Sequence, residues 1–194
     1  MPLLLALPAP VLPSANGRVQ LLPYSPAHNA ELSALLSDPK VWEQGFAPGR
    51  SAMPNTPSEM DQFLVHRAQV PVLFTILVDD KIAGTTGVVK VYHHRSAALV
   101  GRTVLGVAFW GRGLNRQIKE LLFEWLFVCG ARTIECEVAQ SNQRSLASLQ
   151  SMGFTVRGTR RRATPGGRAP WRNLAVLSGG KSQWMSAKEL ANVG

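Results

Sequence analysis

Hydrophobic residues alternate with polar ones, or form short β-branched runs, along several stretches of the chain and indicate β-strands. The alternation is clearest near the middle, where Ile134, Cys136 and Val138 face one way and the residues between them face the other. Seven segments have this character: 16–24, 71–79, 82–92, 97–108, 132–138, 154–163 and 169–178. Two of the connections are predicted turns, at 79–81 and at 164–167.

Apolar residues at helical spacing predict the helices between these strands. The longest spans about 113–129. Its apolar face carries Leu114, Ile118, Leu121, Leu122, Trp125, Leu126 and Cys129, and its polar side Arg116, Lys119, Glu120 and Glu124. A shorter helix is expected at 142–151, and a tail helix from Lys181.

Capping signals predict two more helices in the first third of the chain. Ser25 followed by Pro26 predicts a helix that ends at Asp38. Thr56, with a glutamate three residues later, predicts another that ends near Gln69. Residues 40–55 between them are expected to form a loop.

The order of these elements predicts a single α/β domain with a mixed sheet. We expect residues 16–194 to form the domain and residues 1–15 to be a loose N-terminal arm. The arm is apolar, but prolines interrupt it and it lacks the basic beginning of a signal peptide.

Composition narrows the class of protein. Of 194 residues, 45% are hydrophobic, which is typical of a globular chain, and no apolar run approaches the roughly 20 residues of a membrane-spanning helix. Cys129 and Cys136 lie in apolar segments, so we expect buried, reduced thiols and a cytoplasmic protein. We expect no metal site and no membrane partner.

The most informative motif is the glycine-broken turn Gly111–Gly113 between a predicted strand and the longest helix. Such a turn leaves N–H groups open at the positive end of the helix, where they attract phosphate. The alternative to a phosphate-binding site is an ordinary strand-to-helix turn without a ligand. A third glycine and a Gly-Lys-Ser/Thr sequence are both missing, so neither a dinucleotide-binding fold nor a P-loop is supported.

A second motif begins at Asn142, where Asn142 and Ser145 lie three residues apart at a predicted helix start. Simple capping of the helix explains this spacing. Contact with a ligand is compatible with capping, because both residues lie at an exposed helix end.

Together the two motifs give the chain a resemblance to the GCN5-related N-acetyltransferases, over roughly residues 16–185. Trp110–Asn115 resembles the family's Gln/Arg-x-x-Gly-x-Gly/Ala motif for acetyl-CoA. Asn142–Ser145, followed by Met152–Phe154, resembles its Asn-x-x-Ser…Gly-Phe segment. Within the family, the chain looks most like the ribosomal-protein N-terminal acetyltransferases of the RimJ/RimL type.

The resemblance implies an α/β fold whose mostly antiparallel sheet, flanked by helices, splays between strands 97–108 and 132–138. It implies acetyl-CoA as cosubstrate, with the pantetheine arm in that gap, and an acetyl group transferred to a primary amine. Val107 and Phe109 would border the pantetheine and Asn142 would bond to it or to the far end of the cofactor. The pyrophosphate would lie on backbone N–H groups of Arg112, Gly113, Leu114 and Asn115.

The resemblance also implies a general acid, Ser145, while the general base is missing from its usual place. Related enzymes often carry a glutamate on the strand before the phosphate turn, where this chain has Arg102 and no carboxylate. The remaining candidates for the base are Glu43, His93, His94 and Glu137; alternatively, water takes the proton from an amine that is already neutral. Trp42 and Phe46 are candidates for an acceptor pocket or for simple packing.

The positive charge of the chain is compatible with several kinds of anionic partner. The net charge is +9, and six arginines gather near the end of the chain: Arg157, Arg160, Arg161, Arg162, Arg168 and Arg172. These arginines either form a solvated, charge-rich hairpin or bind a partner: the phosphates of CoA, an acidic acceptor, nucleic acid or a ribosome. The alternative function is therefore a basic RNA- or ribosome-binding module without catalysis. The sequence does not decide whether the protein is a homodimer.

Overall fold

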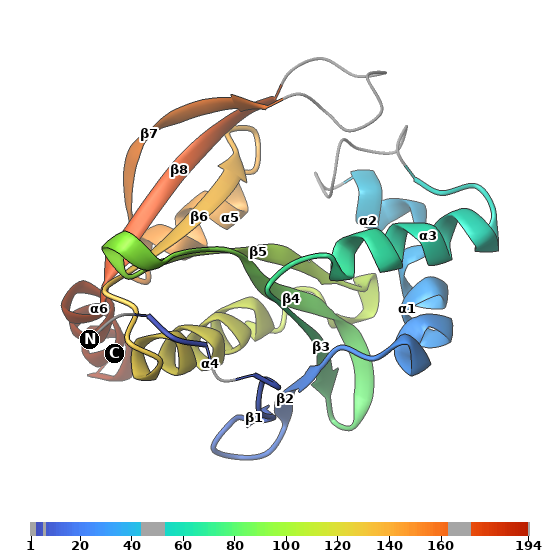
Figure 1. Ribbon diagram of the computed structural model, residues 1–194, viewed down its shortest axis with the longest axis horizontal. Helices are drawn as coiled ribbons and strands as arrows, with labels where there is room; N and C mark the ends of the chain where they lie inside the picture. Colours follow the sequence, from blue (N-terminus) through green and yellow to red (C-terminus); the bar gives the residue numbers. More distant parts are fainter. Residues whose placement is uncertain (1–2, 6, 44–52, 163–171, 194) are drawn as a thin grey trace.

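The computed structural model describes residues 3–5, 7–43, 53–162 and 172–193 (Figure 1). Its described strands form one eight-stranded sheet in the order β1-β2-β3-β4-β5-β6-β8-β7. The strands are β1 (Leu12–Pro13), β2 (Val19–Pro23), β3 (Val72–Val78), β4 (Lys81–Tyr92), β5 (Ala97–Leu105), β6 (Thr133–Ala139), β7 (Thr155–Arg162) and β8 (Arg172–Gly180). Neighbouring strands are antiparallel except β5 and β6, which are parallel. The predicted α/β fold with a mostly antiparallel sheet is confirmed.

Helices cover both faces of this sheet. They are η1 (Pro26–His28), α1 (Asn29–Leu36), α2 (Pro39–Glu43), α3 (Pro57–Ala68), η3 (His93–Arg95), η4 (Val107–Phe109), α4 (Leu114–Val128), α5 (Gln143–Gln150) and α6 (Lys181–Val193). The apolar face of α4 packs in the main hydrophobic cluster, with β2 among its neighbours. A second cluster joins α1, α2 and α3 to the other face, so each side of the sheet has its own core (Figure 1). Within the described residues, no helix has the length and apolar character needed to cross a membrane.

The two predicted caps begin helices as expected. The Ser25 hydroxyl accepts a hydrogen bond from the N–H of Ala27, and Thr56 Oγ1 accepts one from Glu59 N at 3.2 Å. The first helix starts with the single 3₁₀ turn η1 before α1. Local side chain-to-backbone bonds of this kind satisfy N–H groups that the helix itself leaves open.

Two predicted boundaries are wrong. Part of the expected loop 40–55 is the helix α2, because Trp42 is fully buried and its Nε1 donates to the carbonyl oxygen of Leu36 at 2.7 Å. The strand expected at 97–108 ends at Leu105. Gly106 N still donates to Ala83 O at 2.9 Å, but the chain then turns into η4. Tertiary contacts, which a local pattern does not contain, set both ends.

The expectation of a loose N-terminal arm is also wrong for the residues described. Leu12 and Pro13 pair with β2 as an antiparallel edge strand. Leu3 is fully buried in the main cluster, and Leu4 N donates to Cys129 O at 3.1 Å. The apolar character of this segment therefore reflects packing onto the sheet.

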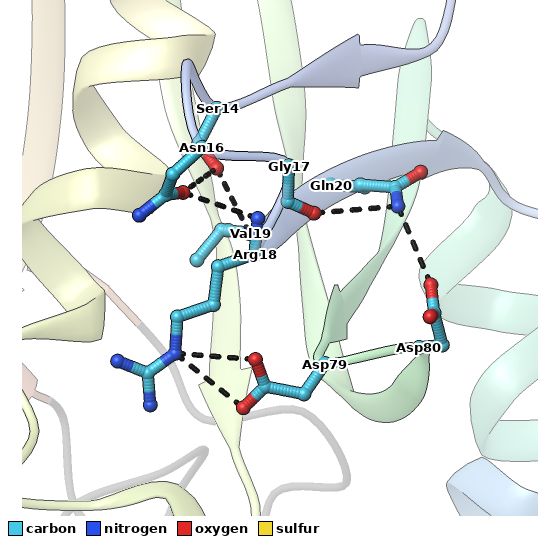
Figure 2. A network of polar contacts seen from close by, with 8 residues as sticks. All are labelled: Ser14, Asn16, Gly17, Arg18, Val19, Gln20, Asp79 and Asp80. Carbon is cyan, nitrogen blue, oxygen red and sulfur yellow. Dashed lines mark hydrogen bonds and ion pairs between the residues drawn. The ribbon is translucent and has the colours of Figure 1, made fainter.

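Polar contacts join the turn between β1 and β2 to the turn between β3 and β4 (Figure 2). Arg18 pairs with Asp79 at 3.3 Å, and Gln20 Nε2 donates to Asp80 Oδ1 at 3.5 Å. The Arg18 and Asp79 side chains are about half exposed, so the pair adds little to stability and mainly keeps the two turns side by side.

Candidate functional site

The glycine turn forms an open start for α4. Gly111 and Gly113 have φ of +72° and +69°, a left-handed conformation that side chains with a Cβ disfavour. A Cβ at either position would meet nothing within 4 Å, so backbone conformation rather than crowding requires glycine there. Gly113 is the N-cap of α4 and supplies no side-chain cap. Arg112 and both glycines are exposed, which leaves the helix start accessible to an anion.

Val107 and Phe109 leave the strand and lie in η4, just before the turn. They pack in different directions: Val107 against the second cluster and Phe109 against the main one. Trp110 Nε1 donates to Leu105 O at 2.8 Å, which folds η4 back onto the end of β5. The segment is thus a compact link that places the turn beside the last residues of β5.

The second motif lies against the first. Asn142 is the N-cap of α5, and its Oδ1 accepts from Ser145 N at 3.1 Å. Asn115 Nδ2, in the first turn of α4, donates to Ser148 Oγ at 3.4 Å, and the Arg144 guanidinium lies 5.6 Å from the Trp110 ring centre. The starts of α4 and α5 are therefore adjacent.

The sheet opens beside these helix starts. β5 and β6 pair only from Ala97 with Thr133 to Val100 with Cys136, although β5 continues to Leu105. β6 continues to Ala139 with β8 as its partner. The second half of β5 thus has β4 on one side and is not paired with β6 on the other.

A β-bulge shapes β5 where it leaves β6. Thr85 pairs with Val104 and Gly87 with Gly101, so Thr86 faces two residues, Arg102 and Thr103. Arg102 has φ of +56°, which is unusual for a residue with a side chain.

Two buried basic side chains, one from the helices on each face of the sheet, donate hydrogen bonds to residues at the bulge. From α3, Arg67 Nη2 donates to Thr85 Oγ1 at 3.0 Å and to the carbonyl oxygen of Arg102. From α4, Lys119 Nζ donates to Thr103 Oγ1 at 2.9 Å. Burial, together with the nearby Arg102, lowers the pKa of Arg67 to about 9; burial also lowers the pKa of Lys119.

Lys119 contradicts the expectation from helical spacing. The spacing assigns it to the polar side of the helix, yet it is 6% exposed and points into the sheet. Arg67 likewise gives no sequence signal beyond its place in an amphipathic helix. A lysine one position after a core residue such as Ile118 lies at the edge of the apolar face, so only the neighbouring layer decides its burial.

The candidate bases are spread over the molecule. His93 and His94 are exposed in η3, before β5, whereas the glycine turn follows the other end of that nine-residue strand, roughly 30 Å away. Glu137 lies past the β5–β6 pairing and forms an ion pair with Arg160 at 2.8 Å. Glu43 is exposed at the end of α2. The structure thus separates the histidines from the predicted site.

Two candidates for the acceptor pocket have different outcomes. Trp42 packs in the second cluster, with its ring centre 5.3 Å from that of Phe63, so packing explains it. Phe46 lies outside the described residues, as do the predicted turn at 164–167 and Arg168. The two cysteines are free; Cys136 is buried, as expected, and Cys129 is only partly buried.

Comparison with known proteins assigns the family. Residues 18–155 match the model of the acetyltransferase (GNAT) domain. A search of curated proteins finds no match. A protein from T. thermophilus described as an acetyltransferase is 27% identical, with a TM-score of 0.76 over 91% of this chain and 93% of that one.

Two further solved structures share the fold. A GCN5-related N-acetyltransferase from Brucella melitensis is 21% identical, with a TM-score of 0.76 over 93% of this chain and 82% of that one. RimL, a ribosomal L7/L12 α-N-protein acetyltransferase in complex with coenzyme A, is 19% identical, with a TM-score of 0.71 over 88% of this chain and 98% of that one. Because the family model matches well over half of the sequence, the chain belongs to the GNAT acetyltransferase family.

Proposed function

We propose that this protein is an acetyl-CoA-dependent N-acetyltransferase that moves an acetyl group to a primary amine, with the catalytic domain at residues 16–194. One observation carries the proposal: the uncapped, glycine-bounded start of α4 lies next to the start of α5 and the opening between β5 and β6. The RimL neighbour contains coenzyme A, and another neighbour, MccE, is in complex with acetyl-CoA and AMP.

The residues of the turn fit a pyrophosphate. Backbone N–H groups of Arg112, Gly113, Leu114 and Asn115 are the proposed donors, at the positive end of a 15-residue helix. The space around both glycines lets phosphate oxygens approach the backbone closely.

The neighbouring residues suit the rest of the cosubstrate. We assign Val107 and Phe109 to the border of the pantetheine, because η4 lies between the glycine turn and the end of β5. Asn142 uses its Oδ1 in capping α5, and its Nδ2 is the group we assign to bonding the cosubstrate. The same side chain then caps the helix and contacts the ligand.

Acetyl-CoA supplies an activated thioester, which the protein has to orient. The reaction also needs one proton delivered to the leaving thiolate and one removed from the acceptor amine. The Ser145 hydroxyl, half-buried in the first turn of α5, is the proposed acid that protonates the leaving thiolate. On β5 the expected carboxylate is replaced by Arg102, so we propose that the acceptor amine reaches the site neutral or loses its proton to water.

The acceptor class stays broad: a protein N-terminus, as in the RimJ/RimL type, or a small-molecule amine. The RimL neighbour is a ribosomal L7/L12 α-N-protein acetyltransferase, so protein N-termini are the first acceptors to test. We further propose a cytoplasmic location, in keeping with two free cysteines. A homodimer is a further proposal.

The alternative is a basic ribosome-binding module, and the basic edge strand β7 favours it. Arg157 and Arg161 on this strand are exposed, and Arg160 is half exposed although it pairs with Glu137. This reading predicts RNA binding that weakens steeply with salt and an absence of acetyl-CoA binding.

The proposed cosubstrate site is tested by calorimetry on Gly113→Asp. The added carboxylate should repel the pyrophosphate and weaken acetyl-CoA binding by about tenfold or more. Gly17→Asp is the matched control, because Gly17 has φ of +70° and equally open surroundings but lies in the turn between β1 and β2 and not at the start of α4. Equal affinity in the two variants contradicts the pyrophosphate assignment, and no heat from the wild-type protein contradicts the enzyme proposal.

A further inference from the structure

Lys119 is a buried amine whose contacts differ from those of a structural lysine. It is 6% exposed in the middle of α4, and within the described part of the chain it forms no ion pair with a carboxylate. Its hydrogen-bond partner is the hydroxyl of Thr103, and the Cys136 thiol lies near enough to influence its pKa. Burying a cationic group without a carboxylate is costly, which makes a purely structural role a poor explanation.

The hydrogen bond from Lys119 to Thr103 ends on the part of β5 that borders the opening in the sheet. Thr103 lies three residues beyond Val100, the last residue of β5 that pairs with β6. Thr103 is partly exposed, whereas its hydrogen-bond partner Thr86 on the neighbouring strand β4 is fully buried. The bulge at Arg102 and Thr103 shifts the side-chain alternation at this point. Lys119 therefore reaches, through one hydroxyl, the region where the second half of β5 is unpaired on its β6 side.

The distance between the two threonine hydroxyls allows either one to donate, and the full burial of Thr86 favours Thr86 as the donor. Thr103 Oγ1 lies 2.8 Å from Thr86 Oγ1 and accepts from Lys119 Nζ. Among the described residues, Thr103 is the hydrogen-bond partner of the buried Thr86 hydroxyl, so Thr86 keeps its hydrogen satisfied only by donating to Thr103. An ammonium can only donate. With Thr86 and Lys119 as donors, both lone pairs of Thr103 are occupied, and its own hydrogen is left to point away from them.

We infer that Thr103, oriented by Lys119 and Thr86, donates its hydroxyl hydrogen to the thioester carbonyl oxygen of the bound acyl-CoA. Thr103 is then a catalytic residue and Lys119 a positioning residue. The donor is held in place before the reaction, and a donor of this kind stabilises negative charge that develops on the oxygen. This inference rests on the proposed function, because it requires acetyl-CoA in the opening between β5 and β6.

The test is the infrared band of a ¹³C-labelled thioester carbonyl in acetyl-CoA bound to the protein. Thr103→Val keeps the shape and removes the donor, so the band should move to higher frequency. Thr103→Ser restores the hydroxyl and should return the band to the wild-type position. Lys119→Met leaves the donor but removes its orientation, and should broaden the band and move it part of the way.

Kinetics give a second readout once an acceptor is in hand. Thr103→Val should lower kcat by about 100-fold and leave the dissociation constant of acetyl-CoA within about twofold, because the bond strengthens in the transition state. Thr155→Val is the control: this exposed threonine on β7 lies on the edge strand, and its removal should change neither readout. Where the valine variant fails to fold, Thr103→Ala makes the same comparison.

The outcomes separate the two proposals. An unchanged carbonyl band in Thr103→Val, with wild-type affinity for acetyl-CoA, overturns the role of Thr103 and leaves the proposed function standing. A Lys119→Met protein with the wild-type band and kcat overturns the positioning role. A wild-type protein that does not bind acetyl-CoA removes the proposed function and the inference with it.

Discussion

Glycine is needed at different positions of this protein for different physical reasons. Gly113 is required by its positive φ and has open space around it, whereas Gly106 has ordinary dihedral angles but a Cβ there would lie 2.5 Å from Cγ of Leu35. The first glycine leaves the start of α4 open, where we propose that the pyrophosphate binds, and the second lets β5 end against α1. Ser145 combines an observed contact with a proposed role, since its N–H donates to the capping Asn142 and its hydroxyl is the proposed general acid.

Ser145→Ala should lower kcat by about 100-fold, because the thiolate would leave without its proton donor, and should leave KM for acetyl-CoA nearly unchanged. Steady-state kinetics with a thiol-release readout measures this. The helix should be unaffected, since the backbone N–H that Asn142 caps is retained. Ser141→Ala, in the exposed turn before α5, is the control. Wild-type kcat in the Ser145 variant, with chemistry rate-limiting, removes the serine from the mechanism.

The site depends on where elements begin and end. α4 starts at an uncapped glycine, and α5 starts at an asparagine that caps it through one oxygen. Asn115 joins the start of α4 to Ser148 in the second half of α5, and Arg144 at the start of α5 lies against Trp110 just before the glycine turn. β5 contributes by losing its partner β6 after Val100, which opens the sheet beside them. Element ends, which have unsatisfied backbone groups, therefore provide most of the proposed binding groups.

Two substitutions at Asn142 separate capping from ligand binding. Asn142→Asp keeps a capping oxygen but replaces the Nδ2 donor, so the free energy of unfolding should change by less than about 0.5 kcal/mol while acetyl-CoA affinity falls about fivefold or more. Asn142→Ala should lose about 1 kcal/mol of stability and the affinity as well. Urea denaturation and calorimetry measure the two effects. Full affinity in the aspartate variant would mean that Asn142 only caps.

The whole molecule is held together by a core on each face of the sheet and by its N-terminal segment. Leu3 packs in the main cluster beside α4, although it precedes the first paired strand by nine residues. The bond from Leu4 N to Cys129 O joins the beginning of the chain to the end of α4. The helix that carries the proposed anion site is thus fixed at its far end by the N-terminal segment.

Neighbouring leucines test this packing. Leu3→Ala should lower the free energy of unfolding by about 2–5 kcal/mol, because a fully buried side chain leaves a cavity. Leu4→Ala should change it by less than about 0.5 kcal/mol, because Leu4 is 60% exposed. Chemical denaturation measures both. Equal small effects in the two variants would contradict this packing and support the expectation of a loose N-terminal arm.

Local patterns in the sequence account for much of the fold. Strands and helices with a clear period of two or 3.6 residues were predictable, because each residue's preference and its neighbours within one turn decide them. The glycine turn and the Asn142 cap were predictable for the same reason, and their order along the chain gave the resemblance to the acetyltransferase family.

Tertiary contacts decided the remainder. Lys119 is buried because Thr103 lies opposite it on β5, and α2 forms because Trp42 has a buried site to fill. The N-terminal residues join the sheet because β2 offers a free edge and α4 an apolar face. In each case the deciding partner is distant in sequence or belongs to another layer. Only the folded chain brings such partners together, so the buried lysine beside the opening in the sheet is a property of the tertiary structure.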